Sequence, residues 1–481
     1  MKHSHKIIFA FILLVFSTVS CKKQLNTVPE GAIVDLNSFK AIKIALIGCY
    51  DGFQTDGYYN SPASSGVGNG WSALPDLMGD DMIEALNSLG NWRRASEMTY
   101  STDNSIVQEV FTAPYEIASR VNNILQVLGT YENDPLVSGE AKIVKAQLLA
   151  IRAHVHFDLM RYFAPDFGRN STSLGVPYVT VFDPQKPFAN LPARSTVKEN
   201  YDKIFEDLNN SILLFREAGN TDNNTTRSFV DSSVVYAIKA RVNYYASNWS
   251  AAAKDADVVI SLNPLANAAD YITMYTTAGE ATPPSEVVWA IPSDNLLRPG
   301  GATNGSSPSY RVSESLFTSI TSLGGAYVNS AIINSSAANP TTGFRRRRLQ
   351  KYAGVKSFKV YRTGEMILIK AEAEQRLGND AVSLASLNSL RTNRGVATGT
   401  ETGTNLLAAI SLLRRVELLG EGHRWFDLKR TTKTINRLEC GTAGNSISNI
   451  CSIDASSKGW AFPIPLNDKI ANPNLIQNKG Y

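Results

Sequence analysis

The sequence predicts a mainly α fold, in which a scaffold of paired helices carries a loop-rich, irregular region. Two observations predict it. Several long segments repeat apolar residues at three- and four-residue spacing, the pattern of a helix that turns one face toward a core. The segments between them are rich in Asn, Ser, Thr, Gly and Pro, which favour turns. We therefore expect rigid helices joined by long polar loops.

Residues 139–163 give the clearest amphipathic helix. Its apolar stripe runs through Val144, Leu148, Ile151, Val155 and Leu159. Ser138 is the predicted N-cap, because its hydroxyl could accept a hydrogen bond from a free backbone N–H of the first turn. Residues 105–129 and 197–217 have similar periodicity. Pro114 is expected to bend or interrupt the first of these two helices.

A helix, a tight Asn-containing turn and a helix rich in small residues occur twice. The first pair covers 231–247 and 250–261, and the second covers 361–377 and 380–393. Alanines in these helices would let neighbouring helices approach closely. Such hairpins resemble tetratricopeptide units, which stack to bury a continuous face. Their irregular spacing leaves an unrelated all-α bundle as the alternative.

Five segments are predicted to be loops from their turn-forming composition. They are residues 218–228, 263–308, 321–343, 394–405 and 440–458. Loops of this length in a compact protein are usually functional. A helical scaffold with long polar loops suits recognition of a ligand.

The N-terminus has the pattern of an export signal. A basic start with Lys2 and Lys6 is followed by an apolar run from Ile7 to Phe16, about half the length of a membrane-spanning helix. Ser20 followed by Cys21 resembles the lipobox of bacterial lipoproteins, in which the cysteine is acylated after cleavage. The alternative is an ordinary cleaved signal with an incidental cysteine.

Charge and cysteine content exclude two classes of protein. The formal charge of +4 falls to +2 when residues 1–20 remove Lys2 and Lys6, which argues against a nucleic-acid binder. The chain has no CxxC pair and no Cys/His cluster, so we expect no metal site. Cys440 and Cys451 lie close in a loop-like segment, and a disulfide between them is possible in an exported protein.

Several blocks, in order along the chain, resemble the SusD/RagB family of outer-membrane lipoproteins. The C-terminal blocks are 360–377 (VYRTGEMILIKAEAEQRL), 414–430 (RRVELLGEGHRWFDLKR) and 462–481 (FPIPLNDKIANPNLIQNKGY). Residues 139–163, 194–208, 227–261 and 285–289 also fit that family's pattern. With the lipobox, the resemblance covers essentially the whole chain.

The resemblance implies a non-enzymatic, surface-exposed lipoprotein of a Bacteroidetes outer membrane. It would capture a glycan, or a peptide as in some members, as a lid on a SusC-like TonB-dependent transporter, and would need no cofactor. The implied organisation is a signal peptide and one SusD-like domain with a tetratricopeptide-like scaffold. These parts are the signal at 1–20, the domain at 21–481, the scaffold mainly at 35–262 and 358–430, and loop-rich regions at 263–357 and 431–481.

Residues 422–430 (GHRWFDLKR) look catalytic, but we interpret them as structural. A helix would place Trp425 and Leu428 on one apolar face, and Asp427 could pair with Arg424 or Arg430 at helical spacing. A motif common to a fold that binds different ligands does not by itself carry a site.

Other titratable groups also give no catalytic signature. His154 and His156 are two residues apart on one helix, so they point in different directions and do not form a metal pair. The basic run Arg345–Arg348 is expected to pair with carboxylates or stack on aromatic rings. A surface glycoside hydrolase stays open as an alternative, since acidic residues are plentiful. So does a purely structural transporter lid.

A glycan site needs flat aromatic rings beside amide, carboxylate or guanidinium groups, because sugars present C–H faces ringed by hydroxyls. Trp92, between Asn91 and Arg93, is the best single candidate, and the alternative is that its ring fills the scaffold. In the family such groups come mainly from the region around the first scaffold helix and from later loops. The candidate ligand residues are Trp71, Asp80, Asp81, Asn91, Trp92, Arg93, Tyr100, Asn295, Arg298, Tyr310 and Arg311.

Overall fold

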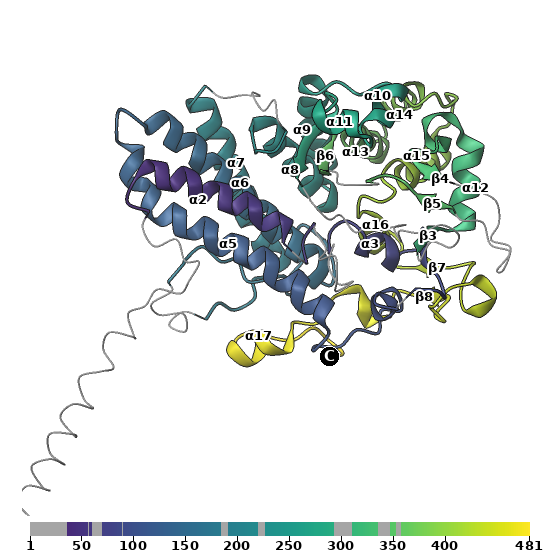
Figure 1. The fold of residues 1–481 in the computed structure, drawn as a ribbon, viewed down its shortest axis with the longest axis horizontal. Helices are drawn as coiled ribbons and strands as arrows, with labels where there is room; N and C mark the ends of the chain where they lie inside the picture. Colours follow the sequence, from purple (N-terminus) through teal and green to yellow (C-terminus); the bar gives the residue numbers. More distant parts are fainter. Residues whose placement is uncertain are drawn as a thin grey trace, which may run out of the picture.

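The structure, a computed structural model, is mainly α-helical, as the sequence predicts. It describes residues 36–55, 57–59, 70–88, 90–183, 191–219, 227–292, 310–334, 347–352 and 357–481. Long helices of the first half of the chain lie side by side at one end of the molecule (Figure 1). They are α2 (Phe39–Asp51), α5 (Ser105–Glu132), α6 (Ser138–Phe163) and α7 (Val197–Glu217).

The ends of these helices follow local hydrogen bonding. Thr196 and Glu199 form a capping box that starts α7. The predicted N-cap at Ser138 is wrong: Ser138 is already helical, and its N–H donates to the Asp134 carbonyl at 2.8 Å, so the preceding turn begins α6. Pro114 does not interrupt α5, which runs on as one helix of 28 residues.

Two helical hairpins form the other half of the scaffold, as predicted. Helix α13 packs against its partner α14 and against the first hairpin. The turn residue Ser247 has a φ of +58° and Gly378 a φ of +84°, so both hairpins turn through the left-handed region. The helices are α8 (Ser232–Tyr245), α9 (Trp249–Leu262), α13 (Thr363–Arg376), α14 (Asp380–Asn393) and the neighbouring α15 (Gly403–Glu417).

The remaining elements are short and lie between the scaffold helices and beside them. The helices are α3 (Leu74–Met78), α4 (Arg93–Ser96), α10 (Ala268–Thr273), α11 (Thr277–Ala281), α12 (Glu314–Leu323), α16 (Arg424–Arg430) and α17 (Leu466–Ala471). The described residues also form four 3-10 helices, η1 (Gly52–Gln54), η2 (Gly325–Val328), η3 (Thr442–Gly444) and η4 (Lys458–Trp460). The segment 263–308, predicted to be loop throughout, therefore holds two of these short helices and a strand.

The described strands pair as four antiparallel two-stranded ladders. Two of the ladders join segments that are distant in the sequence, and the other two join segments less than 20 residues apart. They are β1 (Met82–Glu84) with β3 (Tyr310–Val312), β2 (Val287–Ile291) with β6 (Phe358–Arg362), β4 (Ile333–Asn334) with β5 (Arg348–Leu349), and β7 (Ile435–Asn436) with β8 (Ser452–Ile453).

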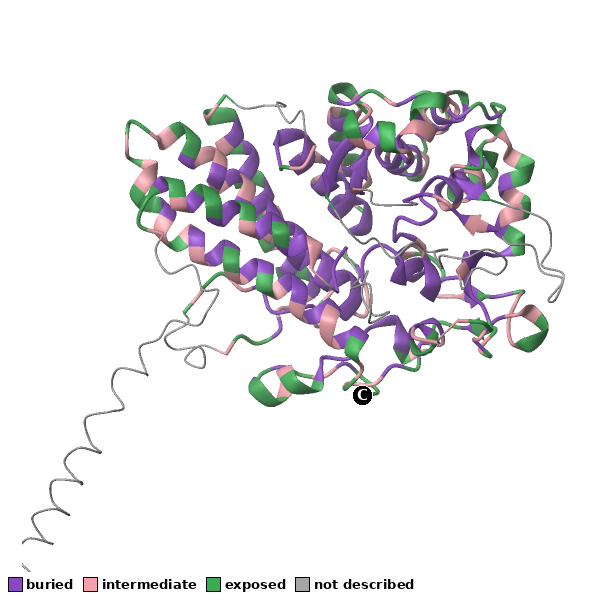
Figure 2. Ribbon diagram, in the orientation of Figure 1, coloured by how far each residue is buried: buried purple, intermediate pink, exposed green. Residues whose placement is uncertain are grey.

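Burial follows the facing sides of the helices (Figure 2). The second half of α6 is almost entirely buried, from Leu148 to Phe163, because neighbouring elements cover it on several sides. Its two histidines have separate surroundings, as predicted. His154 lies 3.1 Å from the Tyr361 hydroxyl, whereas His156 accepts a hydrogen bond from the Val179 N–H.

A buried network of charges ties the second hairpin to the loop-rich half. Arg362 and Arg394 both pair with Glu286 and Glu417, and Arg362 also donates to Glu421. All five side chains are at most 2% exposed. Burial alone would raise the pKa of Glu417, but the guanidinium groups of Arg394 and Arg362 outweigh it and hold that pKa low. The network therefore fixes the end of β6 and the C-terminal ends of α14 and α15 relative to the segment that leads into β2.

The segment 422–430 is built into the fold, but its predicted internal pairs are wrong. Trp425 and Leu428 are buried as expected. The charged residues instead pair with distant segments, which sequence spacing could not reveal. The pairs are Asp427 with Arg414 at 2.8 Å, Arg424 with Asp80 at 2.6 Å, and Arg430 with Glu372 at 2.9 Å.

Cys440 and Cys451 form a disulfide. In the basic run, Arg347 is buried and pairs with Glu439 at 2.6 Å, as predicted, while Arg345 and Arg346 lie outside the described residues. Across the described part of the chain, no helix combines the length and apolar character that crossing a bilayer needs.

Candidate ligand-binding site

The short ladder of β1 and β3 brings two predicted ligand-binding segments together. Its register places Ile83 opposite Arg311 and Glu84 opposite Tyr310. Trp92 lies near both Glu84 and Tyr310, close enough to affect the pKa of each. The candidates of residues 80–93 and 310–311 thus gather at one place, although more than 200 residues separate them in the sequence.

Three of the gathered candidates are buried and hold the fold. Asp81 is 1% exposed and accepts a hydrogen bond from Arg415, and burial raises its pKa despite the nearby cations. Arg311 is 2% exposed and donates to the Gly444 carbonyl at 2.7 Å. Trp92 is fully buried, so its ring offers no face to a sugar. This burial favours the alternative, that Trp92 fills the interior.

The accessible side chains of the group are Asn91, Arg93 and Tyr310. Asn91 and Tyr310 are half-buried, and Arg93 is exposed, with Nε 3.2 Å from Glu97. Burial, and then the charge of Glu84, raise the pKa of the Tyr310 phenol, so it stays neutral and can donate a hydrogen bond. An aromatic ring, an amide and a guanidinium are therefore available to a ligand here.

The disulfide-closed loop between Cys440 and Cys451 borders this site. Within it, the Ile447 N–H donates to the Glu84 carbonyl at 2.9 Å, and the Asn449 N–H donates to Glu97 at 2.9 Å. The sequence predicted the loop and allowed the bridge, but nothing in it indicated that this loop lies against β1. We name Asn91, Arg93, Tyr310 and the adjoining loop the β1–β3 site.

Trp71 and Tyr100 lie elsewhere, in the core. Trp71 is 2% exposed, and its ring lies against Tyr58, with centroids 4.4 Å apart. Tyr100 is 2% exposed and packs on Phe462 at 4.3 Å. Both rings are enclosed by other aromatic side chains, so the expectation that they face a ligand is not supported by their surroundings.

The last three candidates are Asp80, Asn295 and Arg298. Asp80 is half-buried and accepts a hydrogen bond from Arg424. Burial raises the pKa of Asp80, but the hydrogen bond and the charge of Arg424 outweigh burial, so the pKa is lowered and the carboxylate stays ionised. Asn295 and Arg298 lie outside the described residues.

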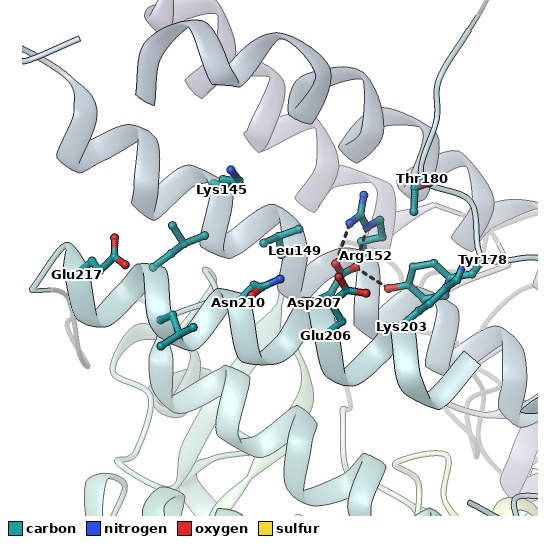
Figure 3. A pocket seen from close by; sticks show the side chains of 12 residues that line it. Lys145, Leu149, Arg152, Tyr178, Thr180, Lys203, Glu206, Asp207, Asn210 and Glu217 are labelled. Atoms are coloured by element: carbon teal, nitrogen blue, oxygen red, sulfur yellow. Dashed lines mark hydrogen bonds and ion pairs between the residues drawn. The ribbon is translucent and has the colours of Figure 1, made fainter. Parts of the chain in front are cut away.

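A separate groove of about 460 Å³ lies between α6 and α7 (Figure 3). At its floor, Arg152 makes two hydrogen bonds of 2.7 Å to Asp207, which also accepts one of 2.6 Å from the Tyr178 hydroxyl. These groups satisfy one another, so the exposed Lys203, Glu206 and Asn210 along α7 are left to meet a ligand. No predicted ligand residue lines this groove. The three- and four-residue spacing of polar residues on α7 was the only sequence signal for it.

Comparison with known proteins now identifies the family. The SusD family model matches residues 318–481, and a second model, described as "Starch-binding associating with outer membrane", matches residues 68–244. The chain belongs to the SusD family.

Individual relatives agree with this assignment over the full length. A SusD-like protein of Formosa agariphila is 23% identical and is covered completely, as is this chain. A SusD superfamily protein from Bacteroides vulgatus has a TM-score of 0.76 at 23% identity, covering 92% of this chain and 99% of its own. A SusD-like carbohydrate binding protein from the same species has a TM-score of 0.73 at 19% identity, covering 91% and 97%. At these identities, the structural matches establish the shared fold.

SusD family membership agrees with a structural role for residues 422–430. Gly422 has a φ of +75°, and a Cβ there would lie 2.0 Å from the Trp71 carbonyl oxygen. The glycine thus lets two distant backbones meet. Among the described residues, no group of three or more His, Cys, Asp or Glu side chains is placed to hold a metal ion.

Proposed function

We propose that this protein captures a glycan at the cell surface and delivers it, uncleaved, to a SusC-like TonB-dependent transporter. The observation that carries the proposal is the match of both halves of the chain to SusD-type family models, one described as starch-binding and associated with the outer membrane. A structural relative described as a SusD-like carbohydrate binding protein supports it.

The proposed contacts are Asn91, Arg93 and Tyr310 of the β1–β3 site, with Asn295 and Arg298 from outside the described residues. A sugar ring can rest its C–H face on the phenol ring, while its hydroxyls exchange hydrogen bonds with the amide and the guanidinium. The neighbouring backbone is held by the ladder and by the disulfide-closed loop, so little ordering is needed when the ligand binds.

The protein would be held at the outer membrane by a lipid on Cys21, after removal of residues 1–20. The basic start, the apolar run and the Ser20–Cys21 junction support this anchor. A Cys21→Ser variant should leave the membrane fraction and appear in the soluble fraction. Continued membrane association of that variant, without a lipid, would contradict the anchor.

Binding can be tested by retention of the purified protein in gels that contain starch or other polysaccharides. We expect Tyr310→Ala to weaken retention by about tenfold, which corresponds to about 1.4 kcal/mol, a reasonable value for one lost ring contact. Tyr131→Ala is the matched control, since Tyr131 is also half-buried but packs on Phe39 of α2. If both variants bind like the wild type, the β1–β3 site is not the glycan site.

The purified protein can also distinguish this function from the three alternatives. A peptide-binding member of the family would bind peptides and ignore every glycan. A glycoside hydrolase would generate new reducing ends from a glycan, and one neutralised carboxylate would abolish this. A purely structural lid would bind neither class of ligand.

A further inference from the structure

A second cleft, of about 430 Å³, opens between α7 and the first helical hairpin, α8–α9. Its volume lies in the range of small-molecule sites. Helix α7, at the edge of the group of long helices, lies beside α8 of the hairpin (Figure 1). The side chains that line it are Arg169, Phe205, Asn209, Tyr236, Lys239, Asn243, Asn248, Ala251, Lys254 and Asp255. We call this the α7–α8 cleft.

Two half-buried aromatic rings give the cleft its apolar surface. Phe205 stacks beside Tyr201 at a centroid distance of 6.2 Å, which fixes the ring in place. Tyr236 lies on the opposite wall, with the Lys239 ammonium 5.8 Å from its ring centre. Rings held in this way can pack against the C–H face of a sugar without first being ordered.

Fixed amide and carboxyl groups lie beside the rings. Asn243 is 4% exposed and donates to Asp255 at 2.9 Å, while the Asn248 amide donates to Asn243 at 3.2 Å. Asp255 is 7% exposed, and burial raises its pKa. Asn209 is exposed on α7 and makes no side-chain hydrogen bond within the described part of the chain. These groups are hydrogen-bond donors and acceptors of the kind that hydroxyls require.

Positive charge exceeds negative charge in the lining. Arg169, Lys239 and Lys254 face a single lining carboxylate, Asp255, whose closest cation is Lys239 at 3.8 Å. Lys254 is exposed and has no ion-pair partner among the described residues. Arg169 pairs with Asp202 through Nη2, but its Nη1 is buried without a hydrogen-bond partner in the same described set. A buried N–H without a partner is unfavourable, so a ligand that places a hydrogen-bond acceptor beside Nη1 of Arg169 would be favoured.

We propose that the α7–α8 cleft is a second ligand site, separate from the β1–β3 site, that binds a saccharide carrying carboxylate or sulfate groups. An anionic group would compensate Lys254 and could accept a hydrogen bond from Nη1 of Arg169. The sugar ring would lie between Phe205 and Tyr236. A small inorganic anion would use the cations alone and leave the rings and amides without a role.

The test is titration calorimetry of the purified protein with four probes. These are a galacturonic acid trisaccharide, a sulfated galactan oligosaccharide, maltotriose and inorganic sulfate. We expect at least one acidic saccharide to bind tenfold or more tightly than maltotriose and sulfate, with an affinity that falls as salt rises. Comparison of the first two probes decides between carboxylate and sulfate. Equal affinity for all four, or tightest binding of free sulfate, overturns the proposal.

Variants locate the binding. Lys254→Gln lies on the surface, so the fold should persist, and it should weaken the acidic saccharide about tenfold; Phe205→Ala should weaken it as well. Lys43→Gln is the matched control, because Lys43 is an exposed lysine of α2 that already pairs with Glu140, and neither residue lines this cleft. Tyr310→Ala in the β1–β3 site should leave this binding unchanged. Loss of binding in Tyr310→Ala, or unchanged binding in Lys254→Gln and Phe205→Ala, would overturn the assignment to this cleft.

Discussion

Arg394 gives the sharpest test of what holds the second hairpin to the loop-rich part of the molecule. Its side chain is 0% exposed, and Nη2 donates to both oxygens of Glu286 at 2.8 Å and to Glu417 at 2.9 Å. Nη1 donates to the Ala266 carbonyl at 2.7 Å. Replacement by methionine keeps much of the volume but removes the charge and every donor.

The expected loss follows from the charges left behind. Removing one partner of a buried ion pair typically costs about 3–5 kcal/mol, because the other partner stays buried and uncompensated. Arg362 still pairs with Glu286 and Glu417, which limits the loss in Arg394→Met to this range. The effect should depend on pH. Without Arg394, burial should raise the pKa of Glu417, so the variant regains stability relative to wild type as pH falls and the carboxyl binds a proton.

The assay is urea unfolding followed by tryptophan fluorescence at pH 7 and pH 5. We expect a lower midpoint for Arg394→Met at both values, with the larger difference at pH 7. Lys142→Met is the control: its partner Glu217 is 56% exposed, and exposed pairs contribute little. If Arg394→Met unfolds at the same urea concentration as this control, the network does not stabilise the fold and the reasoning is wrong.

Three further predictions concern other parts of the fold. Replacing Cys440 and Cys451 by serine should remove about 3 kcal/mol of loop-closure stabilisation for a separation of 11 residues, because the unfolded chain is no longer constrained; a lower midpoint in urea unfolding would show it, and an unchanged midpoint would contradict it. Burial lowers the pKa of His156 to about 3, so between that value and about pH 6.5 only the unfolded chain binds a proton at this histidine, and the protein becomes less stable as the pH is lowered. The variant His156→Gln should reduce this pH dependence of the unfolding free energy by about 1.4 kcal/mol per pH unit in urea unfolding. An unchanged slope would refute this expectation. Gly422→Ala should lower the melting temperature, because Gly422 has a positive φ and the added Cβ would strike a backbone oxygen. Gly129→Ala, in open space on α5, should instead stabilise the protein by about 0.5–1 kcal/mol. Equal melting temperatures for the two variants would contradict both expectations.

The scaffold could be predicted closely where local signals act alone. Helix α7 begins and ends where the sequence indicated, since the Thr196–Glu199 capping box and the apolar stripe agree. Helix α14 is similar, because the turn at Gly378 admits a left-handed residue. Ser138 failed as a cap because the turn at Asp134 had already started the helix, a contact that residue preferences do not encode.

The candidate site could be predicted only in part, because long-range pairing decides which side chains face solvent. Trp92 stands between two polar residues, a pattern that fits an exposed ring as well as a buried one. The pairing of β1 with β3 settles which applies, and it depends on Tyr310, more than 200 residues away. The partner of Asp427 was missed for the same reason: Arg414 lies on another helix.

The most recognisable residues of this chain are therefore poor guides to its ligand. The buried charges of Arg362, Arg394 and Glu417 join hairpin, strand and loop, and a change at any of them unbalances the others. The side chains that we propose to contact a ligand, such as Tyr310 and Lys254, are more accessible than these and take no part in the buried network. Relatives near 20% identity keep this fold, as TM-scores of 0.73 and 0.76 show, so most positions are free to vary around it. Specificity should therefore be sought by exchanging accessible residues between relatives, since exchange within the buried network would alter stability and leave the choice of ligand unchanged.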